Sequence, residues 1–176
     1  MIVDLHAHTT ASDGLLAPGA LLAKAKAGGL AAIAITDHDT ALGVREALAG
    51  PIPDGLEVIP GIEVSSYVGQ SDIHVLGYFI DPHAPVLLDF EAKRAVARLE
   101  RLGRMLDQLT AAGMPITLEE VRDQPGGDGA PGRPHVARVL IAKGFATSMA
   151  DVFSRILGKQ GPGYVPMEKP EAREAA

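Results

Sequence analysis

The chain has 176 residues, of which 47% are hydrophobic, which is enough for one domain with a buried core and excludes a disordered chain. Its formal net charge of −6 argues against an extended nucleic-acid-binding surface, although a local basic pocket stays possible. It has no cysteine, so any metal must be held by His, Asp and Glu. The start of the sequence does not resemble a signal peptide, and no apolar run approaches the roughly 18 residues of a membrane span, so we expect a cytoplasmic protein.

The first 80 residues alternate between strand and helix patterns. The segment "MIVDLHAH" alternates in polarity, which is typical of a strand with one polar face, whereas "LAAIAI" is continuously apolar, as in a strand buried on both faces. The order strand, helix, strand, helix, strand is typical of a parallel α/β sheet or barrel. The expected strands lie at 1–8, 30–35, 56–66 and 72–80, and the expected helices lie before Gly28 and at 41–49.

The pattern becomes helical from residue 84 onward. Apolar residues between 84 and 112 form one stripe, and Thr117 begins a capping-box sequence, so a further helix should start there. Helices are also expected at 133–143 and 147–157. At the C-terminus a capped helix is expected to begin after Pro170 and then stops short, so we expect the chain to be C-terminally incomplete. The expected divisions are an α/β part at 1–83, an all-helical insert at 84–160 and a truncated return segment at 161–176.

Side chains that can bind metals lie at or beside the C-terminal ends of the four expected strands. In parallel α/β folds that edge of the sheet binds ligands, because its loops converge on one crevice. Each residue alone has an ordinary explanation: Asp13 suits a turn, Glu63 suits a solvated strand position, and we expect Asp39 to be a helix N-cap. We assign His83 to a turn. A cluster of such groups needs a cation, so their joint placement predicts a metal site at this edge. The strand-end residues are His6, His8, Asp13, Asp37, His38, Asp39, Glu63 and His74.

The residue types also limit the chemistry. A His-x-His pair at a strand end directs both imidazoles to the same side, and Glu63 has two oxygens that could bridge two ions. Clustered divalent ions suit phosphate ester hydrolysis, because they deprotonate water, cancel phosphate charge and hold the leaving oxygen. A site made of nitrogen and oxygen ligands fits Zn, Mn or Fe.

The segments "DLHAHTTASDG", "ITDHDT", "IPGIEVSS" and "DIHVLGYFID" resemble the successive motifs of the polymerase-and-histidinol-phosphatase (PHP) domain over residues 1–82. The resemblance implies a distorted seven-stranded β/α barrel, of which this chain would be the N-terminal part. It also implies a phosphoesterase site with two or three divalent ions, in which Glu63, Asp13 and His38 are catalytic. The implied ligand sets are His6, His8 and Glu63 for one ion, Glu63 and His74 for a second, and Asp13 and His38 for a third.

The helical part is similar to that of stand-alone bacterial PHP phosphoesterases, through "GRPHVARVLIAKG" and "GPGYVP". Members of that group act on nucleoside 3′,5′-bisphosphates and on the 5′ ends of short oligoribonucleotides. The resemblance implies that Arg133 and His135 face the substrate phosphate, with Lys143 and Tyr164 as further candidates. An arginine fork at a helix N-terminus suits phosphate, although Arg133 could equally be solvated and Lys143 could only complement its helix C-terminus.

The sequence departs from the family pattern at its far end. The family completes its site with a later His-Pro motif and a later Asp-x-His, and neither follows Tyr164. Two alternatives to a nucleotide or short-RNA phosphoesterase therefore stay open. One is a catalytically incomplete remnant or interaction module, and the other is an amidohydrolase-type metal hydrolase. The Thr-Asp-His-Asp and Ser-Asp-Gly segments favour the PHP assignment over the amidohydrolase type.

Overall fold

The structure, a computed structural model, describes residues 1–69, 71–127, 131–167 and 169–175. The chain forms two compact units: Met1–Arg94 with Lys169–Ala176, and Ala95–Glu168. Each unit has its own hydrophobic core. The division at Arg94 differs from the expected boundary at 83/84, because the first turns of helix α3 (Pro85–Ala111) pack with the first unit through Leu87.

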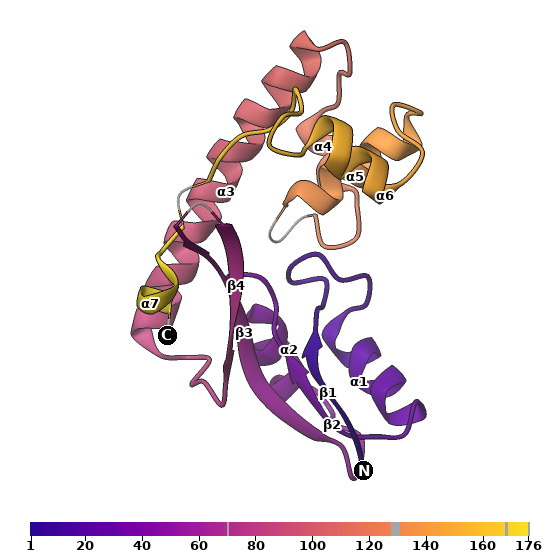
Figure 1. Cartoon of the computed structure of the whole chain (residues 1–176). Coiled ribbons are helices and arrows are strands. Elements are labelled where there is room, and N and C mark those ends of the chain that lie inside the picture. The colour runs from indigo at the N-terminus through magenta and orange to yellow at the C-terminus, as the bar shows by residue number, and fades with distance from the viewer. Residues whose placement is uncertain (70, 128–130, 168, 176) are drawn as a thin grey trace. The chain divides into compact units, whose positions relative to one another are not determined.

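The first unit contains a four-stranded sheet with the order β1 (Ile2–Ala7), β2 (Leu30–Ile35), β3 (Glu57–Val68) and β4 (Ser71–Tyr78) (Figure 1). Strands β1, β2 and β3 are parallel, and the helices α1 (Pro18–Ala27) and α2 (Leu42–Ala49) connect them. The expected alternation of strands and helices is therefore confirmed.

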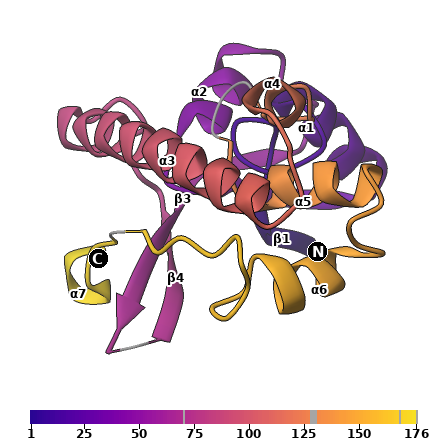
Figure 2. The same ribbon diagram turned by 90° about the horizontal axis from the view of Figure 1, so that it is seen from above.

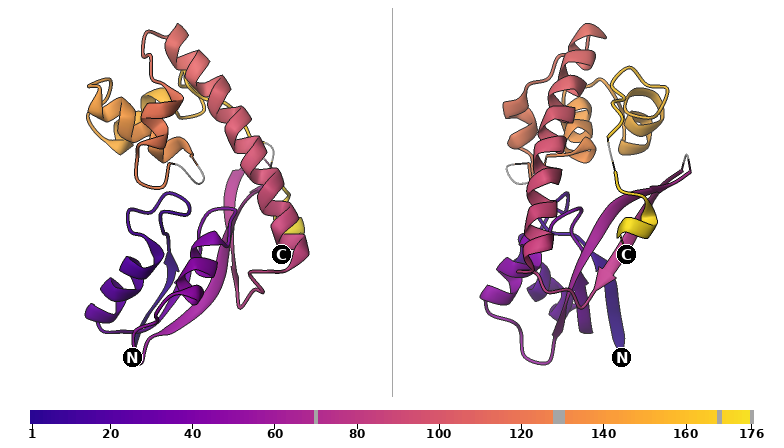
Figure 3. Two further views of the ribbon diagram at one scale, coloured as in Figure 1. Left: turned by 180° about the vertical axis from the view of Figure 1, so that it is seen from behind. Right: turned by 90° about the vertical axis from the view of Figure 1, so that its left-hand side faces the viewer.

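Strand β4 differs from the parallel pattern. It runs antiparallel to β3 and pairs with it from Gly61 opposite Tyr78 to Val68 opposite Ser71, so the two strands lie side by side as a hairpin (Figure 3). A parallel connection needs a crossover of a dozen or more residues, and the chain between β3 and β4 is too short for one. The fourth strand therefore has to reverse direction.

The sheet is curled. Strands β1 and β4 are its two edges, yet the Tyr78 hydroxyl on β4 donates a hydrogen bond of 3.0 Å to the Leu5 carbonyl on β1. The side chains of alternate residues in β2 point to opposite faces of the sheet. Ile33 and Ile35 pack against the two helices, whereas Ala32 and Ala34 pack in a separate small cluster. The result is a mixed α/β unit with a curled sheet.

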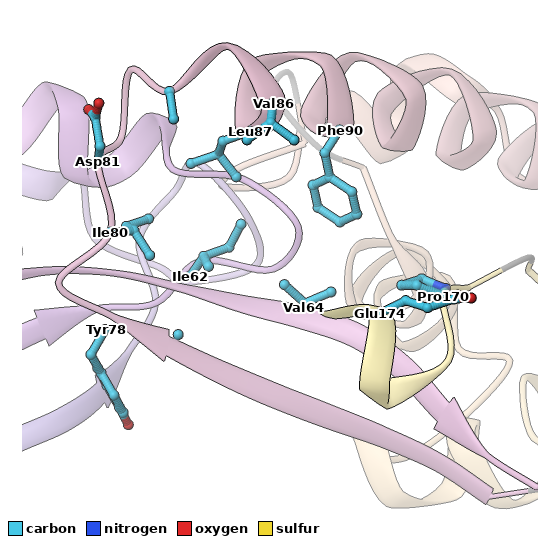
Figure 4. A pocket seen from close by; sticks show the side chains of 12 residues that line it. Ile62, Val64, Tyr78, Ile80, Asp81, Val86, Leu87, Phe90, Pro170 and Glu174 are labelled. Carbon is cyan, nitrogen blue, oxygen red and sulfur yellow. The ribbon is translucent and has the colours of Figure 1, made fainter. Parts of the chain in front are cut away.

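An apolar pocket of about 500 Å³ lies between the β3–β4 hairpin, the start of α3 and α7 (Ala172–Ala175) (Figure 4). Ile62 and Val64 line it, so the intervening Glu63 points to the opposite face of β3. Helix α7 lies beside the hairpin (Figure 2), where Tyr67 N donates to Pro170 O at 3.2 Å. The helix expected after Pro170 is thereby confirmed.

The described residues of the second unit contain helices and no strand. Beyond the remainder of α3 they are α4 (Leu118–Arg122), α5 (Arg133–Ala142), α6 (Met149–Asp151) and a π-helix, η1 (Val152–Ile156). Thr117 and Glu120 form the expected capping box. The single helix expected at 147–157 is instead a short α-helix that continues as the π-helix. That this unit is an insert within a barrel stays a prediction.

Within the described part of the chain, no helix combines the length and apolar character needed to cross a membrane. The long helix α3 carries charged residues throughout and buries Leu102, Met105 and Leu109 in the core of the second unit. Its length therefore reflects packing of an amphipathic face.

Candidate metal centre

The first candidate side chains come from the end of β1. His6 lies within the strand and His8 directly follows it, so both point to the same face. The loop after His8 then folds back tightly. A Cβ at Gly14 would lie 2.3 Å from the His8 carbonyl oxygen, so only glycine fits there. This reversal brings Asp13 to His8, with 3.4 Å between Asp13 Oδ1 and His8 Nδ1.

His38 and Glu63 meet because the chain after β2 continues alongside β3. Glu63 N donates to the Asp37 carbonyl at 3.1 Å, and Asp39 N donates to the Glu63 carbonyl at 2.9 Å. The backbone of His38 is therefore directly beside that of Glu63. Residues far apart in sequence thus become neighbours by parallel pairing.

His74 reaches the same place by a different route from the one expected. It lies inside β4, opposite Ser65 on β3, and not at the end of a parallel strand. Because side chains alternate along a strand and paired residues share a face, His74 and Glu63 project from the same face of the hairpin. The antiparallel direction of β4 therefore places its middle at the ligand-bearing edge.

Glu63 is the centre of the cluster. Its side chain is only 4% exposed, and its Oε2 lies 2.9 Å from His6 Nε2, 3.1 Å from His8 Nε2 and 3.5 Å from His38 Nδ1. Its Oε1 lies 2.5 Å from His74 Nδ1. The two oxygens of one buried carboxylate therefore meet four histidines from three different segments.

The six candidate side chains form three overlapping groups of three residues. Within each group, the donor atoms lie within 4.8 Å of one another. The imidazole rings follow one another in a row, with centroid separations of 5.1, 4.7 and 4.8 Å. Asp13 completes the group around His38, with 3.9 Å between Asp13 Oδ2 and His38 Nε2. The groups are His6, His8 and Glu63; His8, Asp13 and His38; and His38, Glu63 and His74.

The surroundings shift the pKa values of these groups in different directions. Burial opposes ionisation of Glu63, but hydrogen bonds with His74 and His8 hold its pKa well below the usual range. Burial lowers the pKa of His38 to about 4, although the charges of Asp13 and Glu63 act against this. Burial also disfavours protonation of His8, yet its hydrogen bond to Glu63 and the Asp13 charge raise its pKa overall.

The shifts of Glu63 and His38 suit metal ligands. A metal binds the ionised carboxylate and the neutral imidazole, and Glu63 and His38 are held in those forms. The donors are all nitrogen and oxygen atoms, which suits Zn, Mn or Fe more than a soft thiolate-preferring ion. The donor set therefore fits divalent metal ions, and the assignment of each residue as a ligand stays a proposal.

The buried carboxylate of Asp37, which the sequence placed among the strand-end residues but in none of the ligand sets, supports the first loop. Asp37 is 1% exposed and accepts hydrogen bonds from Thr9 N, Thr9 Oγ1 and Ser12 Oγ at 2.6–2.7 Å. A Cβ at Gly43 would lie 2.0 Å from Asp37 Oδ2, so α2 can approach this network only through glycine. The pKa of Asp37 is raised by its burial, and the hydrogen bonds act against that rise. Its place at the end of a predicted strand marked it as a site residue, but the hydrogen bonds to Thr9 and Ser12 were not predicted.

The prediction that Asp39 is a helix N-cap is wrong. The N-cap residue of α2 is Ala41, which has no side-chain cap, and Asp39 lies further upstream in a left-handed backbone conformation with φ of 55°. Its side chain instead accepts a hydrogen bond of 2.8 Å from Ser65 N and pairs with Arg94 at 3.2 Å. His83 lies in an exposed turn, where its backbone N donates to Asp81 Oδ1 at 2.9 Å, as expected.

The predicted substrate-binding residues belong to the second unit. Arg133 is at the first turn of α5, and its guanidinium carbon lies 5.5 Å from the centroid of the Phe153 ring. Lys143 follows the same helix and pairs with Glu120 at 2.7 Å. Tyr164 is half-buried in the segment after η1. A substrate contact for these three stays a proposal.

The fourth predicted substrate-binding residue, His135, is held by contacts within the second unit. Its side chain is fully buried, and its Nδ1 accepts a hydrogen bond of 3.0 Å from Gly132 N. Its Nε2 lies 3.1 Å from the Pro125 carbonyl. Both ring nitrogens therefore contact the backbone of the segment before α5, and a phosphate contact by His135 stays a prediction.

Comparison with known proteins places these residues in a family. The sequence model of the PHP domain matches residues 4–118, which include all six side chains of the cluster. The chain belongs to the PHP domain family. The resemblance seen in the four sequence motifs is thereby confirmed.

Individual PHP relatives match nearly the whole chain. It is 40% identical over 168 residues to the 5′-3′ exoribonuclease Rnm of Escherichia coli, covering 94% of this chain and 57% of the relative. It is 35% identical over 163 residues to the 3′,5′-nucleoside bisphosphate phosphatase of Chromobacterium violaceum, covering 93% of this chain and 57% of that protein. The chain therefore spans a little more than half the length of these relatives.

A solved structure also matches. The structure of an amidohydrolase from Chromobacterium violaceum, with bound sulfate and no metal, has a TM-score of 0.89 and 34% sequence identity. The match covers 98% of this chain and 61% of that one. The mixed α/β architecture of this chain is therefore that of a known relative.

Proposed function

We propose that this chain belongs to a metal-dependent phosphoesterase that acts on nucleoside 3′,5′-bisphosphates or on the 5′ end of short oligoribonucleotides. The observation that carries the proposal is the convergence of six nitrogen and oxygen donor residues around the buried carboxylate of Glu63. The names of two relatives, an exoribonuclease and a bisphosphate phosphatase, support a substrate that contains a nucleotide phosphate ester.

The proposed cofactors are two or three divalent ions, of Mn, Zn or Fe. Bound there, such ions would supply an acidified water and neutralise phosphate charge. The whole protein would have the distorted seven-stranded β/α barrel of the family and would act in the cytoplasm. The proposed ligands are His6, His8 and Glu63 for one ion, Glu63 and His74 for a second, and Asp13 and His38 for a third.

The residues of the chain perform distinct tasks in this proposal. Glu63 offers one oxygen to each side of the cluster, as its contacts with His74 through Oε1 and with His6 through Oε2 indicate. His38 is neutral at pH 7, because its pKa is about 4, so a ring nitrogen keeps its lone pair for coordination. Asp13 supplies a partly exposed carboxylate next to His8 and His38. Glu63, Asp13 and His38 are thus the proposed catalytic residues.

Arg133, Lys143 and Tyr164 are the proposed substrate contacts. The guanidinium of Arg133 can bind two phosphate oxygens at once, and its position in the first turn of α5 adds the favourable potential of a helix N-terminus. Lys143 adds a second positive charge near the other end of this helix. The relative with bound sulfate supports an affinity of this fold for anions that have the shape of phosphate.

A second candidate function is that of an amidohydrolase-type metal hydrolase, the name borne by the solved relative. A His-x-His pair on a strand suits both types of enzyme. The match to a 3′,5′-nucleoside bisphosphate phosphatase, at 35% identity over 163 residues, favours the phosphoesterase. A third candidate is a catalytically incomplete PHP remnant or interaction module, which would bind metal without turnover.

The test measures release of inorganic phosphate from adenosine 3′,5′-bisphosphate by the chain with Mn²⁺. His8→Ala should abolish release, because His8 contacts both Glu63 and Asp13, whereas His83→Ala in the exposed turn should leave it unchanged. Arg133→Ala should raise KM while leaving the amount of bound metal unchanged. Full turnover by His8→Ala would refute the proposed metal site, and metal binding without any turnover by the unaltered chain would favour the remnant.

A further inference from the structure

Asp39 has an unusual backbone conformation for a buried residue other than glycine. It is 2% exposed, directly follows His38 and has φ of 55°, in the left-handed region. A residue other than glycine rarely adopts this conformation, although Asp and Asn do so more readily than most. Such a conformation persists where the surrounding structure holds it, and it is found most often at functional sites.

Two hydrogen bonds tie Asp39 to β3, one at Glu63 and one at Ser65. Its backbone N donates to the Glu63 carbonyl at 2.9 Å, and its Oδ1 accepts from Ser65 N at 2.8 Å. Together with the bond from Glu63 N to the Asp37 carbonyl, they attach the segment that carries His38 along β3. These three bonds therefore hold the backbone around His38 beside Glu63.

Arg94 holds the other carboxylate oxygen. Its Nη2 lies 3.2 Å from Asp39 Oδ2, and the two side chains are 8% and 1% exposed. Arg94 comes from α3, on the side of the first unit. Removing one partner of a buried ion pair destabilises the folded state, because the other charge is then left unpaired in a poorly solvated place.

The environment of Asp39 argues against two other roles. It does not cap α2, whose N-cap residue is Ala41. It is also not among the candidate ligand groups found in the described residues, and its two carboxylate oxygens contact Ser65 N and Arg94 Nη2. The remaining role for Asp39 is an effect on its neighbours His38 and Glu63.

We propose that Asp39 and Arg94 are positioning residues of the metal centre: their ion pair holds the left-handed turn that sets His38 beside Glu63. The inference rests on the proposed metal function, since it assigns a role within that same site. Hydrogen-bonded groups behind metal ligands commonly change metal affinity about 10- to 100-fold when they are removed. Arg94→Met should therefore weaken metal binding without removing any ligand.

The experiment titrates the chelator-treated chain with Co²⁺ alone and records its visible absorption spectrum. For Arg94→Met, we expect a dissociation constant at least about tenfold higher and a changed band pattern, because His38 is no longer held. Arg45→Met is the matched control. It breaks a comparable pair, Arg45–Glu91 at 2.7 Å between α2 and α3, and its Co²⁺ affinity should stay within about twofold of the unaltered chain.

A second variant keeps the test informative if Arg94→Met folds poorly. Asp39→Asn can keep the left-handed turn and the bond from Ser65 N, but it loses the charge that faces Arg94. Its Co²⁺ affinity should also fall, and adding Arg94→Met should cause little further loss, since both changes break one pair. Thermal unfolding followed by circular dichroism shows whether each variant is folded.

The outcomes separate this inference from the proposed function. Failure of the unaltered chain to bind Co²⁺ would refute the metal centre itself. Normal binding by the unaltered chain together with unchanged affinity and spectrum in folded Arg94→Met or Asp39→Asn would refute the positioning role alone. Losses that multiply in the double variant would refute the idea that the two residues act as a pair.

Discussion

The two units of this chain use polar side chains in opposite ways. In the first unit, histidines and carboxylates from separate segments converge on one buried group, Glu63. In the second unit, polar side chains mostly pair with close neighbours in the sequence. Examples are the Thr117–Glu120 capping box, the bond from Gly132 N to His135, and the pair between Asp151 and Arg155.

Two carboxylates illustrate the consequence of this difference. The pKa of Asp151 is lowered by its hydrogen bond to Arg155, one helical turn away at the surface. The pKa of Glu63 is lowered although burial opposes ionisation, because histidines from both sheet edges hydrogen-bond to it. An exposed ion pair between close neighbours in the sequence contributes little to stability, and each charge is already balanced by its partner. A buried carboxylate among histidines can hold a cation, and among the described residues only the first unit contains such candidate groups.

Removing the carboxylate at the centre should have the largest effect. Glu63→Gln loses the negative charge and one oxygen, so the affinity for Mn²⁺ should fall by about a hundredfold or more. Electron paramagnetic resonance of unbound Mn²⁺ measures this affinity. Glu57→Gln, an exposed position at the start of the same strand, is the control and should bind normally. Equal Mn²⁺ affinities of the Glu63→Gln and Glu57→Gln variants would contradict a metal centre around Glu63. The first unit would then no longer differ from the second in this respect.

His135→Ala should affect stability and not metal binding. It removes the acceptor for Gly132 N and leaves a cavity in the core of the second unit, so the free energy of unfolding should fall by roughly 2–3 kcal/mol. Urea denaturation measures the change. A matching loss of Mn²⁺ affinity in the folded variant would contradict the purely structural role that its burial indicates.

Gly43→Ala tests the support behind the ligand loop. The added Cβ would lie 2.0 Å from Asp37 Oδ2 and 2.4 Å from Thr9 Oγ1, so the free energy of unfolding should fall by roughly 1–2 kcal/mol. Gly103→Ala in α3 is the matched control, because nothing lies within 4 Å of its Cβ position. That variant should be more stable by about 0.5–1 kcal/mol, since alanine favours a helix. Changes of the same sign in both variants would contradict the close approach.

Lys143→Ala should have the smallest effect. Its pair with Glu120 is partly exposed, so the melting temperature should change by less than about 2 °C. A differential scanning measurement is sufficient. If the same variant raises KM for the bisphosphate, Lys143 contacts the substrate and is more than a surface partner of Glu120.

Much of the fold and part of the centre could be predicted from local patterns. Polarity alternation, apolar runs and turn residues located four strands and most helices, and Thr117 with Glu120 specified a capping box. The strand-end position of His6 and His8 and the run around His38 also identified ligand-type residues. These features depend on neighbouring residues, which is why they are visible without the fold.

Other features depended on contacts between distant segments. The left-handed turn at Asp39 is held by Ser65 and Arg94, and no local pattern distinguishes it from a helix cap. The burial of His135 likewise results from the packing of α5, whereas its sequence motif suggested a ligand contact. Sequence patterns predict what a side chain can do, but not which distant partner it meets.

For this protein, the sequence alone determined the family, the candidate ligands and the order of strands and helices, because motifs and periodicities are local properties. Only the tertiary structure decided that β4 runs antiparallel, that Glu63 is buried among four histidines and that His74 reaches it from mid-strand. The physical reason is that burial and electrostatic contact are set by chain reversal and sheet curl. Glu63, in the middle of β3, acquires its role only when four histidines surround it.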